Sequence, residues 1–221
     1  MSKSDFIRQN TTVMTPPLVP EVKLHLAHEA VPLWQKTEEE LGEMGLPPPF
    51  WAFAWAGGQA LARYVLDHSS VVENLKVLDL ATGSGLVAIA ALQAGAANTT
   101  AADIDEFATT AAQMNAELNQ VSLDIKLEDL LPQQPPLADV ILVGDLFYEK
   151  MLAARCLGWL RQAQEQGAKI FVGDPGRSYL PRDQLEKLAE YNVAVTRDLE
   201  DAEIKRTAVW QLKAGLMNRS C

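Results

Sequence analysis

The sequence has little of what several classes of protein require. It contains two cysteines, Cys156 and Cys221, and neither stands in a CxxC or Cys/His spacing, which argues against a disulfide framework or a zinc site. Its longest apolar runs, such as 88–92 and 140–143, fall far short of the roughly 20 residues that a membrane helix needs. Lys and Arg number 19 against 29 Asp and Glu, whereas proteins that bind nucleic acid phosphates carry a basic surface. We therefore expect neither a membrane nor a nucleic-acid partner.

The length and composition favour one folded domain with a short extension. The chain has 221 residues, of which 48% are apolar, so disorder of the whole chain is excluded. Residues 1–20 lack a periodic apolar face, a signal-peptide core and the arginines of a transit peptide, so we expect a flexible tail and a cytoplasmic location. Residues 21–58 are expected to form a helical and aromatic N-terminal extension, and residues 59–221 the main domain.

Strand and helix patterns alternate regularly through the main domain. Strands are predicted at 76–80, 99–104, 123–127, 139–144 and 169–172, helices at 59–66, 86–94, 106–119, 149–166 and 182–191, and a terminal strand pair at 193–199 and 207–212. This alternation predicts an α/β fold with a doubly wound, mostly parallel, Rossmann-like sheet. Such sheets bind their ligand at the carboxyl ends of the strands.

A glycine turn between two acidic strand ends is the strongest chemical signal. The first predicted strand contains Asp79 and is followed by Gly83 and Gly85, and Asp103 ends the next strand. Glycines let the backbone approach a ligand, and an acidic side chain at this second strand end accepts hydrogen bonds from ribose hydroxyls. Gly83-x-Gly85-x-x-Ala88 also satisfies the dinucleotide pattern, so an NAD-linked enzyme must be weighed.

Asp79 distinguishes between a dinucleotide and S-adenosylmethionine as the ligand. Its carboxylate would repel a pyrophosphate but would suit an ammonium group, such as the amino-acid end of S-adenosylmethionine. S-adenosylmethionine also carries adenine and ribose but no phosphate. The alternative is that Asp79 is a helix cap or turn residue. The agreement of Asp79 with the glycine turn and Asp103 favours S-adenosylmethionine as the cofactor.

Five motifs resemble a narrower family. In order along the chain they are Pro-Phe-Trp-Ala-Phe-Ala-Trp-Ala-Gly-Gly-Gln-Ala-Leu at 49–61, the turn at 77–85, Ala-Asp-Ile-Asp at 102–105, Gly-Asp-Leu-Phe-Tyr at 144–148 and Gly-Asp-Pro-Gly-Arg at 173–177. From about residue 47 to 212 the chain resembles the lysine methyltransferases of the electron transfer flavoprotein β subunit, within the seven-strand, class I methyltransferases. One departure is Ala81, where many relatives carry glycine. The absence of a mitochondrial presequence implies a bacterial-type member.

The resemblance implies a set of site residues. The catalytic pair would be Asp145 and Tyr148, at the mouth where the target lysine meets the methyl group. Asp129 would lie near adenine, Asp105 is a weaker ribose candidate than Asp103, and Trp51 with Phe53 would form a wall for the lysine stem. The implied cofactor-binding set is Trp55, Gln59, Asp79, Gly83, Gly85, Asp103 and Asp129.

The chemistry of methyl transfer agrees with this assignment. The reaction needs a neutral amine held in line with the methyl group and sulfur, so most of the catalytic work is positioning. Asp145 is expected to orient the incoming lysine by a charge-assisted hydrogen bond. A carboxylate also stabilises the protonated amine, so we expect water to carry the proton away.

Other polar clusters have simpler interpretations. His25 and His28 are three residues apart, but with no third ligand nearby we expect no metal. Asp174 and Arg177 lie in a Pro-Gly turn, where a local ion pair is expected, although substrate contact stays possible. The acidic run 38–40 is a solvated helix face or an attractor for a basic target segment.

Four functions follow from these patterns. The first is a protein-lysine methyltransferase that acts, as a monomer, on the electron transfer flavoprotein β subunit. The second is a methyltransferase of another protein, such as a ribosomal one. The third is a small-molecule N-methyltransferase, which would close a lid over its site, and the fourth is a non-catalytic binding module that has kept the fold.

Overall fold

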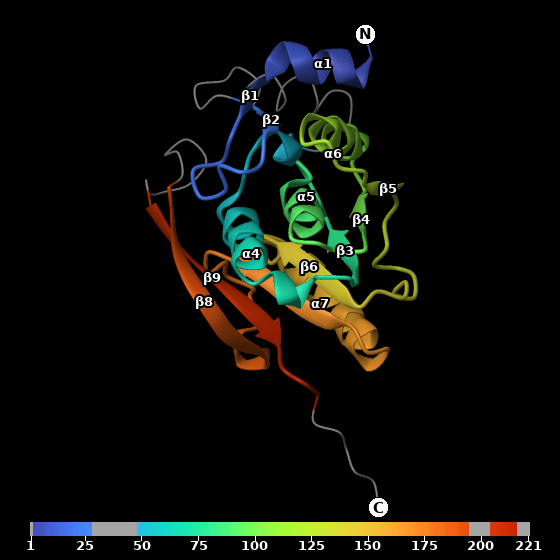
Figure 1. Ribbon diagram of the computed structural model, residues 1–221. Coiled ribbons are helices and arrows are strands. Elements are labelled where there is room, and N and C mark those ends of the chain that lie inside the picture. Colours follow the sequence, from blue (N-terminus) through green and yellow to red (C-terminus); the bar gives the residue numbers. More distant parts are fainter. Residues whose placement is uncertain (1, 28–47, 195–203, 216–221) are drawn as a thin grey trace, which may run out of the picture.

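The computed structural model describes residues 2–27, 48–194 and 204–215. Within them, a seven-stranded sheet has the order β5-β4-β3-β6-β7-β9-β8 (Figure 1). Its strands are β3 (Lys76–Leu80), β4 (Asn98–Asp103), β5 (Asp124–Leu127), β6 (Val140–Gly144), β7 (Lys169–Asp174), β8 (Leu185–Ala194) and β9 (Ile204–Leu212). Neighbours from β5 to β7 are parallel, and β9 is antiparallel to both β7 and β8. The predicted mostly parallel, seven-stranded α/β fold is confirmed.

Helices cover both faces of the sheet. The helices α4 (Ala56–Asp67), α5 (Leu86–Gln93) and α6 (Glu106–Leu118) contribute to the core on one face, and α7 (Lys150–Glu165) packs on the other. The strand β6 shows why its sequence is a continuous apolar run: Val140 and Leu142 face α4 and α5, whereas Ile141 and Val143 face α7, and all four are fully buried.

The strand order changes direction beside β3. The chain passes from β3 through α5 to β4 on one side, while β6 pairs with β3 on the other side. Because neighbouring connections diverge at this point, the carboxyl ends of β3, β4 and β6 are where such a sheet binds its ligand.

The N-terminal segment packs against the sheet's helical layer. It contains α1 (Lys3–Asn10) and a two-stranded ribbon of β1 (Thr12–Met14) and β2 (Leu24–Leu26). The expectation of a loose tail is wrong for α1, because Ser2 and Asp5 form a capping box and Ile7 is fully buried. One buried side chain leaves no periodic pattern in the sequence, which explains the error. The division into an extension over residues 21–58 and a main domain over residues 59–221 stays a prediction.

The helix predicted over residues 182–191 is also wrong. Arg182–Gln184 form one 3₁₀ turn, η4, and β8 then pairs antiparallel with β9, with an irregularity between Lys187 and Ala189. The leucine, glutamate, lysine and alanine of this segment favour a helix, but pairing along the whole of β9 outweighs that preference. The other strands and helices predicted from 59 to 172 are confirmed, the strand at 76–80 with the same bounds and the others with bounds shifted at one or both ends.

Some expectations fall beyond the described residues, including the parts of the extension that contain His28 and the acidic run 38–40.

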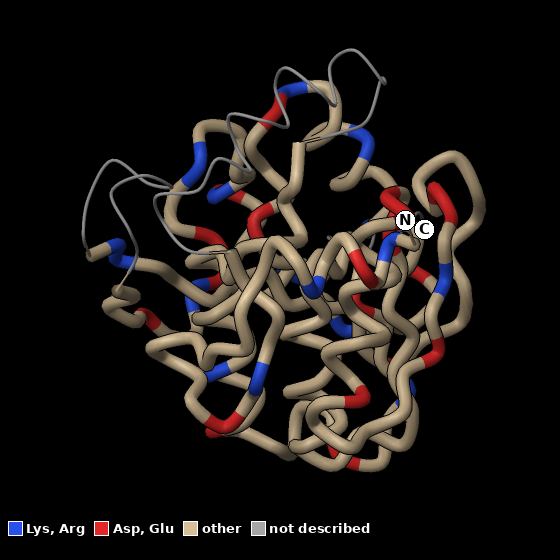
Figure 2. Tube along the Cα trace, turned by 90° about the horizontal axis from the view of Figure 1, so that it is seen from above, with Lys and Arg blue, Asp and Glu red and all other residues tan. Residues whose placement is uncertain are grey.

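Over the described ranges, no helix is long and apolar enough to cross a membrane. The same ranges hold no group of three or more His, Cys, Asp or Glu that could bind a metal ion. Figure 2 shows Lys and Arg interspersed with Asp and Glu along the trace. The prediction that the protein does not bind nucleic acid stays a prediction.

Candidate active site

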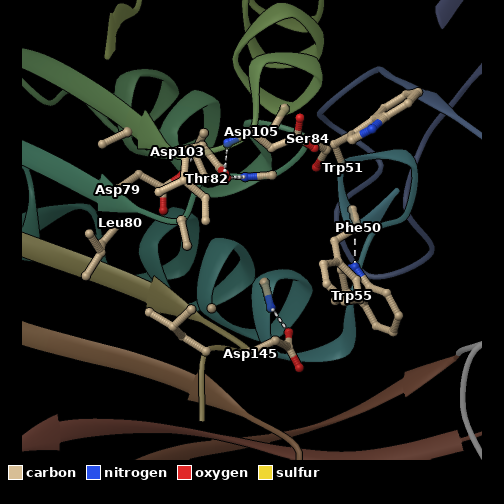
Figure 3. A pocket seen from close by; sticks show the side chains of 18 of the residues that line it. Phe50, Trp51, Trp55, Asp79, Leu80, Thr82, Ser84, Asp103, Asp105 and Asp145 are labelled. Atoms are coloured by element: carbon tan, nitrogen blue, oxygen red, sulfur yellow. Dashed lines mark hydrogen bonds between the residues drawn. The ribbon is translucent and has the colours of Figure 1, made fainter. Parts of the chain in front are cut away.

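A cavity of about 430 Å³ opens at the carboxyl ends of β3, β4 and β6 (Figure 3). Its volume is in the range of small-molecule and cofactor sites. The walls are contributed by the motif at 49–61, called here the aromatic block, by the glycine turn, and by the loops after β4 and β6. The acidic side chains that line it are Asp79, Asp103, Asp105, Glu128, Asp129 and Asp145.

Asp79 is buried at the end of β3 and faces both the turn and the cavity. Its Oδ2 accepts hydrogen bonds from the Thr82 hydroxyl, at 2.6 Å, and from the Ala88 N–H, at 3.1 Å. Burial raises the pKa of Asp79 to about 7, although these hydrogen bonds oppose the shift. Asp79 therefore stabilises the turn through these hydrogen bonds and also lines the cavity. Its role as a turn residue and a role in binding a ligand are compatible.

The turn after β3 uses the left-handed region three times. Gly83 has a φ of 53° and its N–H donates to Asp103 Oδ2 at 2.9 Å. Ala81 has a φ of 58°, which explains why glycine suits this position. Gly85 has a φ of 81°, and an added Cβ would lie 3.0 Å from the Cα and Cβ of Ala112 in α6. Gly85 does not line the cavity; its conformation and its packing against α6 require glycine.

Asp103 and Asp105 follow one another around the end of β4. The Oδ1 of Asp103 accepts the Asp105 N–H at 3.0 Å, and the Oδ1 of Asp105 accepts the Phe107 N–H at 2.8 Å, capping α6. Burial raises the pKa of both carboxyls, that of Asp105 to about 6. Both line the cavity, and the cap gives Asp105 a structural task as well.

Asp129 lies at the more open side of the cavity. Its Oδ1 accepts the Leu131 N–H at 3.1 Å, and its Oδ2 lies 3.3 Å from the Nη2 of Arg155. The side chain is 46% exposed, so this pair is accessible to solvent. The structure thus places Asp129 at the cavity, as the resemblance implied.

The aromatic block forms the opposite wall. Trp51, in η2 (Phe50–Ala52), stacks on Phe107 with ring centroids 5.8 Å apart and planes at 12°. The indole N–H of Trp55 donates to the Phe50 carbonyl at 2.9 Å (Figure 3). Trp51 and Phe53 are almost fully buried and also line the cavity, so they serve the core and the site together.

Gln59 does not line the cavity. Its Nε2 donates to the Ala54 carbonyl at 2.7 Å, and its Oε1 accepts the Leu18 N–H at 3.3 Å. The structure gives no support to the prediction that Gln59 binds the cofactor. Through these two hydrogen bonds Gln59 ties the N-terminal segment to the aromatic block.

Asp145 follows β6 with a φ of 55°, in the left-handed region that L residues rarely adopt. Its Oδ2 accepts the Gly58 N–H at 2.9 Å, and its Oδ1 pairs with the Nη2 of Arg177 at 2.9 Å. Burial raises the pKa of Asp145 to about 6, with the Arg177 charge opposing and the Asp174 charge adding to the shift. The structure thus holds this carboxylate from two directions.

The sequence analysis did not predict the ion pair between Arg177 and Asp145. We expected a local ion pair with Asp174, but the Asp174 Oδ1 accepts the backbone N–H groups of Gly176 and Arg177, at 2.6 and 2.7 Å. The Arg177 side chain reaches Asp145, 32 residues earlier. The signal that could have indicated this is that both residues follow adjacent parallel strands, β6 and β7, at the same edge of the sheet.

Tyr148 lies at the mouth of the cavity and is 47% exposed. Its ring centroid is 5.8 Å from that of Phe50, and burial of the hydroxyl raises its pKa. The cavity therefore brings together Asp145 and Tyr148 with most of the implied cofactor set. The members that line it are Trp55, Asp79, Gly83, Asp103 and Asp129.

Comparison with known proteins identifies the family. A family model described as "Ribosomal protein L11 methyltransferase (PrmA)" matches residues 59–146. The electron transfer flavoprotein beta subunit lysine methyltransferase of Xenopus laevis is 36% identical over 214 residues, which are 94% of this chain and 86% of that protein. The protein of the same name from Homo sapiens is 33% identical over 212 residues, 93% of this chain and 80% of that protein.

This chain belongs to the electron transfer flavoprotein β subunit lysine methyltransferase family. Solved structures support the fold of this methyltransferase. Magnesium protoporphyrin IX methyltransferase from Synechocystis with bound SAM matches with a TM-score of 0.52 and 14% identity over 83% of this chain and 85% of that one. A putative RNA methyltransferase from Pyrococcus horikoshii matches with a TM-score of 0.53 and 15% identity over 80% and 94% of the two chains.

The cofactor of this methyltransferase is S-adenosylmethionine. The residues of the cavity fit it. Asp79 and Asp103 supply buried carboxylates that can accept hydrogen bonds from an ammonium group and from ribose hydroxyls. Leu80 and Leu130 supply apolar surface beside them. This set suits a cationic, phosphate-free ligand better than a dinucleotide, because a pyrophosphate beside Asp79 would face a buried acidic group.

Proposed function

We propose that this protein transfers methyl groups from S-adenosylmethionine to lysine side chains of the electron transfer flavoprotein β subunit. The observation that carries this proposal is the similarity to lysine methyltransferases of that subunit over 94% of the chain. The match is not confined to the cofactor-binding half, because it spans the aromatic block and the loops after β6 and β7 as well. Those segments form the mouth of the cavity.

The cofactor roles follow from the carboxylates. In this proposal Asp79 binds the ammonium group of the amino-acid end, and Asp103 accepts the ribose hydroxyls. Gly83 gives the ligand access to the backbone, Asp129 lies beside adenine, and Trp55 covers the cofactor. Gly85 and Gln59 act indirectly, since Gly85 shapes the turn and Gln59 holds the aromatic block.

At the mouth, the chain's own residues position the lysine. S-adenosylmethionine supplies an electrophilic methyl group on a positively charged sulfur. Asp145 orients the lysine nitrogen, Tyr148 contributes a second hydrogen bond, and Trp51 and Phe53 form the wall beside the methylene stem. Tyr148 and Phe50 are 47% and 39% exposed, so this end of the cavity meets solvent, where the product amine can release its proton to water.

A ribosomal protein is the second candidate substrate. The L11 methyltransferase model matches residues 59–146, and the Lactobacillus johnsonii protein named for that activity is 32% identical over 177 residues. That match covers 76% of this chain but 52% of that protein. It therefore covers less of both chains than the match to the flavoprotein β subunit lysine methyltransferases does.

The test offers both substrates to one preparation. Calorimetric titration first measures S-adenosylmethionine binding by wild type and by Asp145→Asn. Labelled cofactor is then supplied with purified electron transfer flavoprotein or with ribosomal protein L11, and the hydrolysed products are analysed for methyllysine. We expect methyllysine in the flavoprotein β subunit, a large loss in Asp145→Asn and retained cofactor binding. If methyllysine forms in L11 alone, L11 would replace the flavoprotein β subunit as the proposed substrate. Full turnover with unchanged substrate affinity in Asp145→Asn would refute the role of Asp145.

The cytoplasmic location and the monomeric state stay predictions from the sequence. Size-exclusion chromatography with light scattering tests the second, and a stable dimer would contradict it.

A further inference from the structure

Arg177 occupies the place that the lysine substrate is expected to approach. Its Nη2 lies 2.9 Å from Asp145 Oδ1, and its guanidinium carbon lies 5.8 Å from the centre of the Trp55 ring. The side chains of Arg177 and Asp145 are 22% and 10% exposed, so solvent screens this pair poorly. Asp145 and Trp55 are both drawn in Figure 3, and Arg177 lines the same cavity.

A carboxylate beside an aromatic ring is also a good site for a lysine ammonium group. This creates a chemical conflict, because methyl transfer needs the neutral amine with its lone pair. An unpaired buried carboxylate would stabilise the ammonium form by opposite charge and raise the pKa of the lysine. Asp145 alone would therefore bind the substrate well in the form that cannot react.

We propose that Arg177 is a positioning residue that neutralises Asp145, so that the acceptor lysine is held as the free amine. This inference rests on the proposed lysine transfer and deepens it. Asp145 can still accept a hydrogen bond from the amine, since each carboxylate oxygen has more than one lone pair. The net charge that the amine meets at this pair is zero rather than negative. The positive guanidinium further opposes protonation of a nearby nitrogen.

The bond changes balance without another reactant. The lysine lone pair forms the new nitrogen–carbon bond as the methyl carbon's bond to sulfur breaks, with its electron pair passing to sulfur. The methylated nitrogen is then a cation and releases its proton to water at the open mouth. Arg177 changes how much free amine is present before this step and takes no part in the bond changes.

In the part of the chain that the structure describes, several charged groups act on Asp145 and its neighbours. Asp174, at the end of β7, faces the pair and raises the pKa of Asp145, so it adds negative charge. Tyr148, from the loop after β6, meets the negative fields of Asp103 and Glu149 as well as the positive field of Arg177. Arg182, from η4, acts on Asp174. Of these groups, Arg177 is the cation in direct contact with the Asp145 carboxylate.

The pH dependence of kcat tests the proposal in wild type, Arg177→Gln and Arg177→Lys. In Arg177→Gln we expect the rising limb of the kcat–pH profile to move to higher pH by about one unit. At pH values below this limb kcat then falls about tenfold, and at pH values above it kcat changes little. The KM for the protein substrate is unchanged or lower, because the ammonium form binds well. Arg177→Lys restores the limb toward its wild-type position.

Arg155→Gln is the matched control. Arg155 also lines the cavity, but it pairs with Asp129, so its removal should leave the position of the limb unchanged. A structural role of Arg177 would lower kcat equally at every pH, and that result would overturn the proposal. So would an equal shift in Arg155→Gln.

A second measurement needs no substrate. Titration of the Asp145 carboxyl carbon by ¹³C NMR gives its pKa in wild type and in Arg177→Gln, and we expect an increase of about one unit in the variant. An unchanged pKa would overturn the inference. If the wild type methylates no flavoprotein, the proposed substrate fails, while this titration still decides whether Arg177 sets the charge of Asp145.

Discussion

The backbone N–H of Gly58 donates a 2.9 Å hydrogen bond to Asp145 Oδ2. This contact joins the first turn of α4 to the loop after β6, across 87 residues of sequence. It explains why the Gly-Gly pair of the aromatic block and the Asp-x-Phe-Tyr motif belong to one site. The position of Asp145 depends on a close approach of backbone that only small residues allow.

Gly57→Ala should damage both stability and activity. An added methyl group at Gly57 would collide with the Gly173 carbonyl oxygen and lie 2.5 Å from Asp145 Oδ2. We expect a loss of about 1–3 kcal/mol in the free energy of unfolding, from overpacking, and a larger fractional loss of kcat than of cofactor affinity. Chemical denaturation and steady-state kinetics measure these effects.

Gly58→Ala is the control in the same helical turn. There the nearest atom to an added Cβ would be Val87 Cγ2, at 3.9 Å, and the hydrogen bond to Asp145 comes from the backbone. Alanine also favours the helix, so Gly58→Ala should be neutral or stabilising by up to about 1 kcal/mol. Equal damage in both variants would contradict the packing argument.

Asp79→Asn should weaken cofactor binding. The substitution keeps the shape of the side chain but removes the charge that binds the ammonium group, so we expect the Kd for S-adenosylmethionine to rise about tenfold to a hundredfold. Asp124→Asn, an exposed carboxylate in β5 that does not line the cavity, should leave the Kd unchanged. Calorimetric titration decides, and a wild-type Kd in Asp79→Asn would remove Asp79 from the cofactor site.

The same variant should change how stability depends on pH. The pKa of Asp79 is raised to about 7 in the folded protein, against about 3.9 in an unfolded chain, so the folded state retains a proton that the unfolded state releases. Its contribution to stability is therefore present at low pH and is lost as pH rises toward 7.

Between pH 5 and 8, without cofactor, wild type should lose up to about 3 kcal/mol more stability than Asp79→Asn. Asp145 and Asp105, with pKa values raised to about 6, act in the same direction in both proteins. Urea unfolding at several pH values measures the difference. Parallel curves for the two proteins would show that Asp79 is not protonated in this range.

Gly85→Ala should destabilise the protein. The new Cβ would lie 3.0 Å from Ala112 and force an L residue to a φ of 81°, so we expect a loss of about 2 kcal/mol or more. Gly158→Ala in α7 has nothing within 4 Å of its added Cβ and should be neutral or stabilising. Thermal unfolding compares the two, and an unaffected Gly85→Ala would refute the packing role.

Local sequence patterns predicted the parts of the fold in which local and tertiary preferences agree. The run 139–144 could be recognised because β6 is buried on both faces, and Asp79, Gly83 and Asp103 because a turn and two strand ends place them at one edge. The segment 182–191 failed because its helix-favouring residues are held in β8 by pairing with β9. Such pairing is not visible in a local pattern.

Only the parts of the site that lie within single sequence motifs could be predicted. Motif resemblance placed Asp145 and Tyr148 at the mouth, but not the ion pair with Arg177, because that contact depends on how β6 and β7 lie side by side. Gln59 was assigned to the cofactor because it lies in the aromatic block. Its contacts with Ala54 and Leu18 depend on the path of the N-terminal segment, which the sequence did not reveal.

The central claim is tested most directly by intact-mass spectrometry of purified electron transfer flavoprotein after incubation with this protein and S-adenosylmethionine. Asp79→Ala, tested beside wild type, is the control for the cofactor site. We predict mass increments of whole methyl groups on the β subunit with wild type and none with Asp79→Ala. An unmodified β subunit, with cofactor binding by wild type shown in the same preparation, would contradict the proposed substrate.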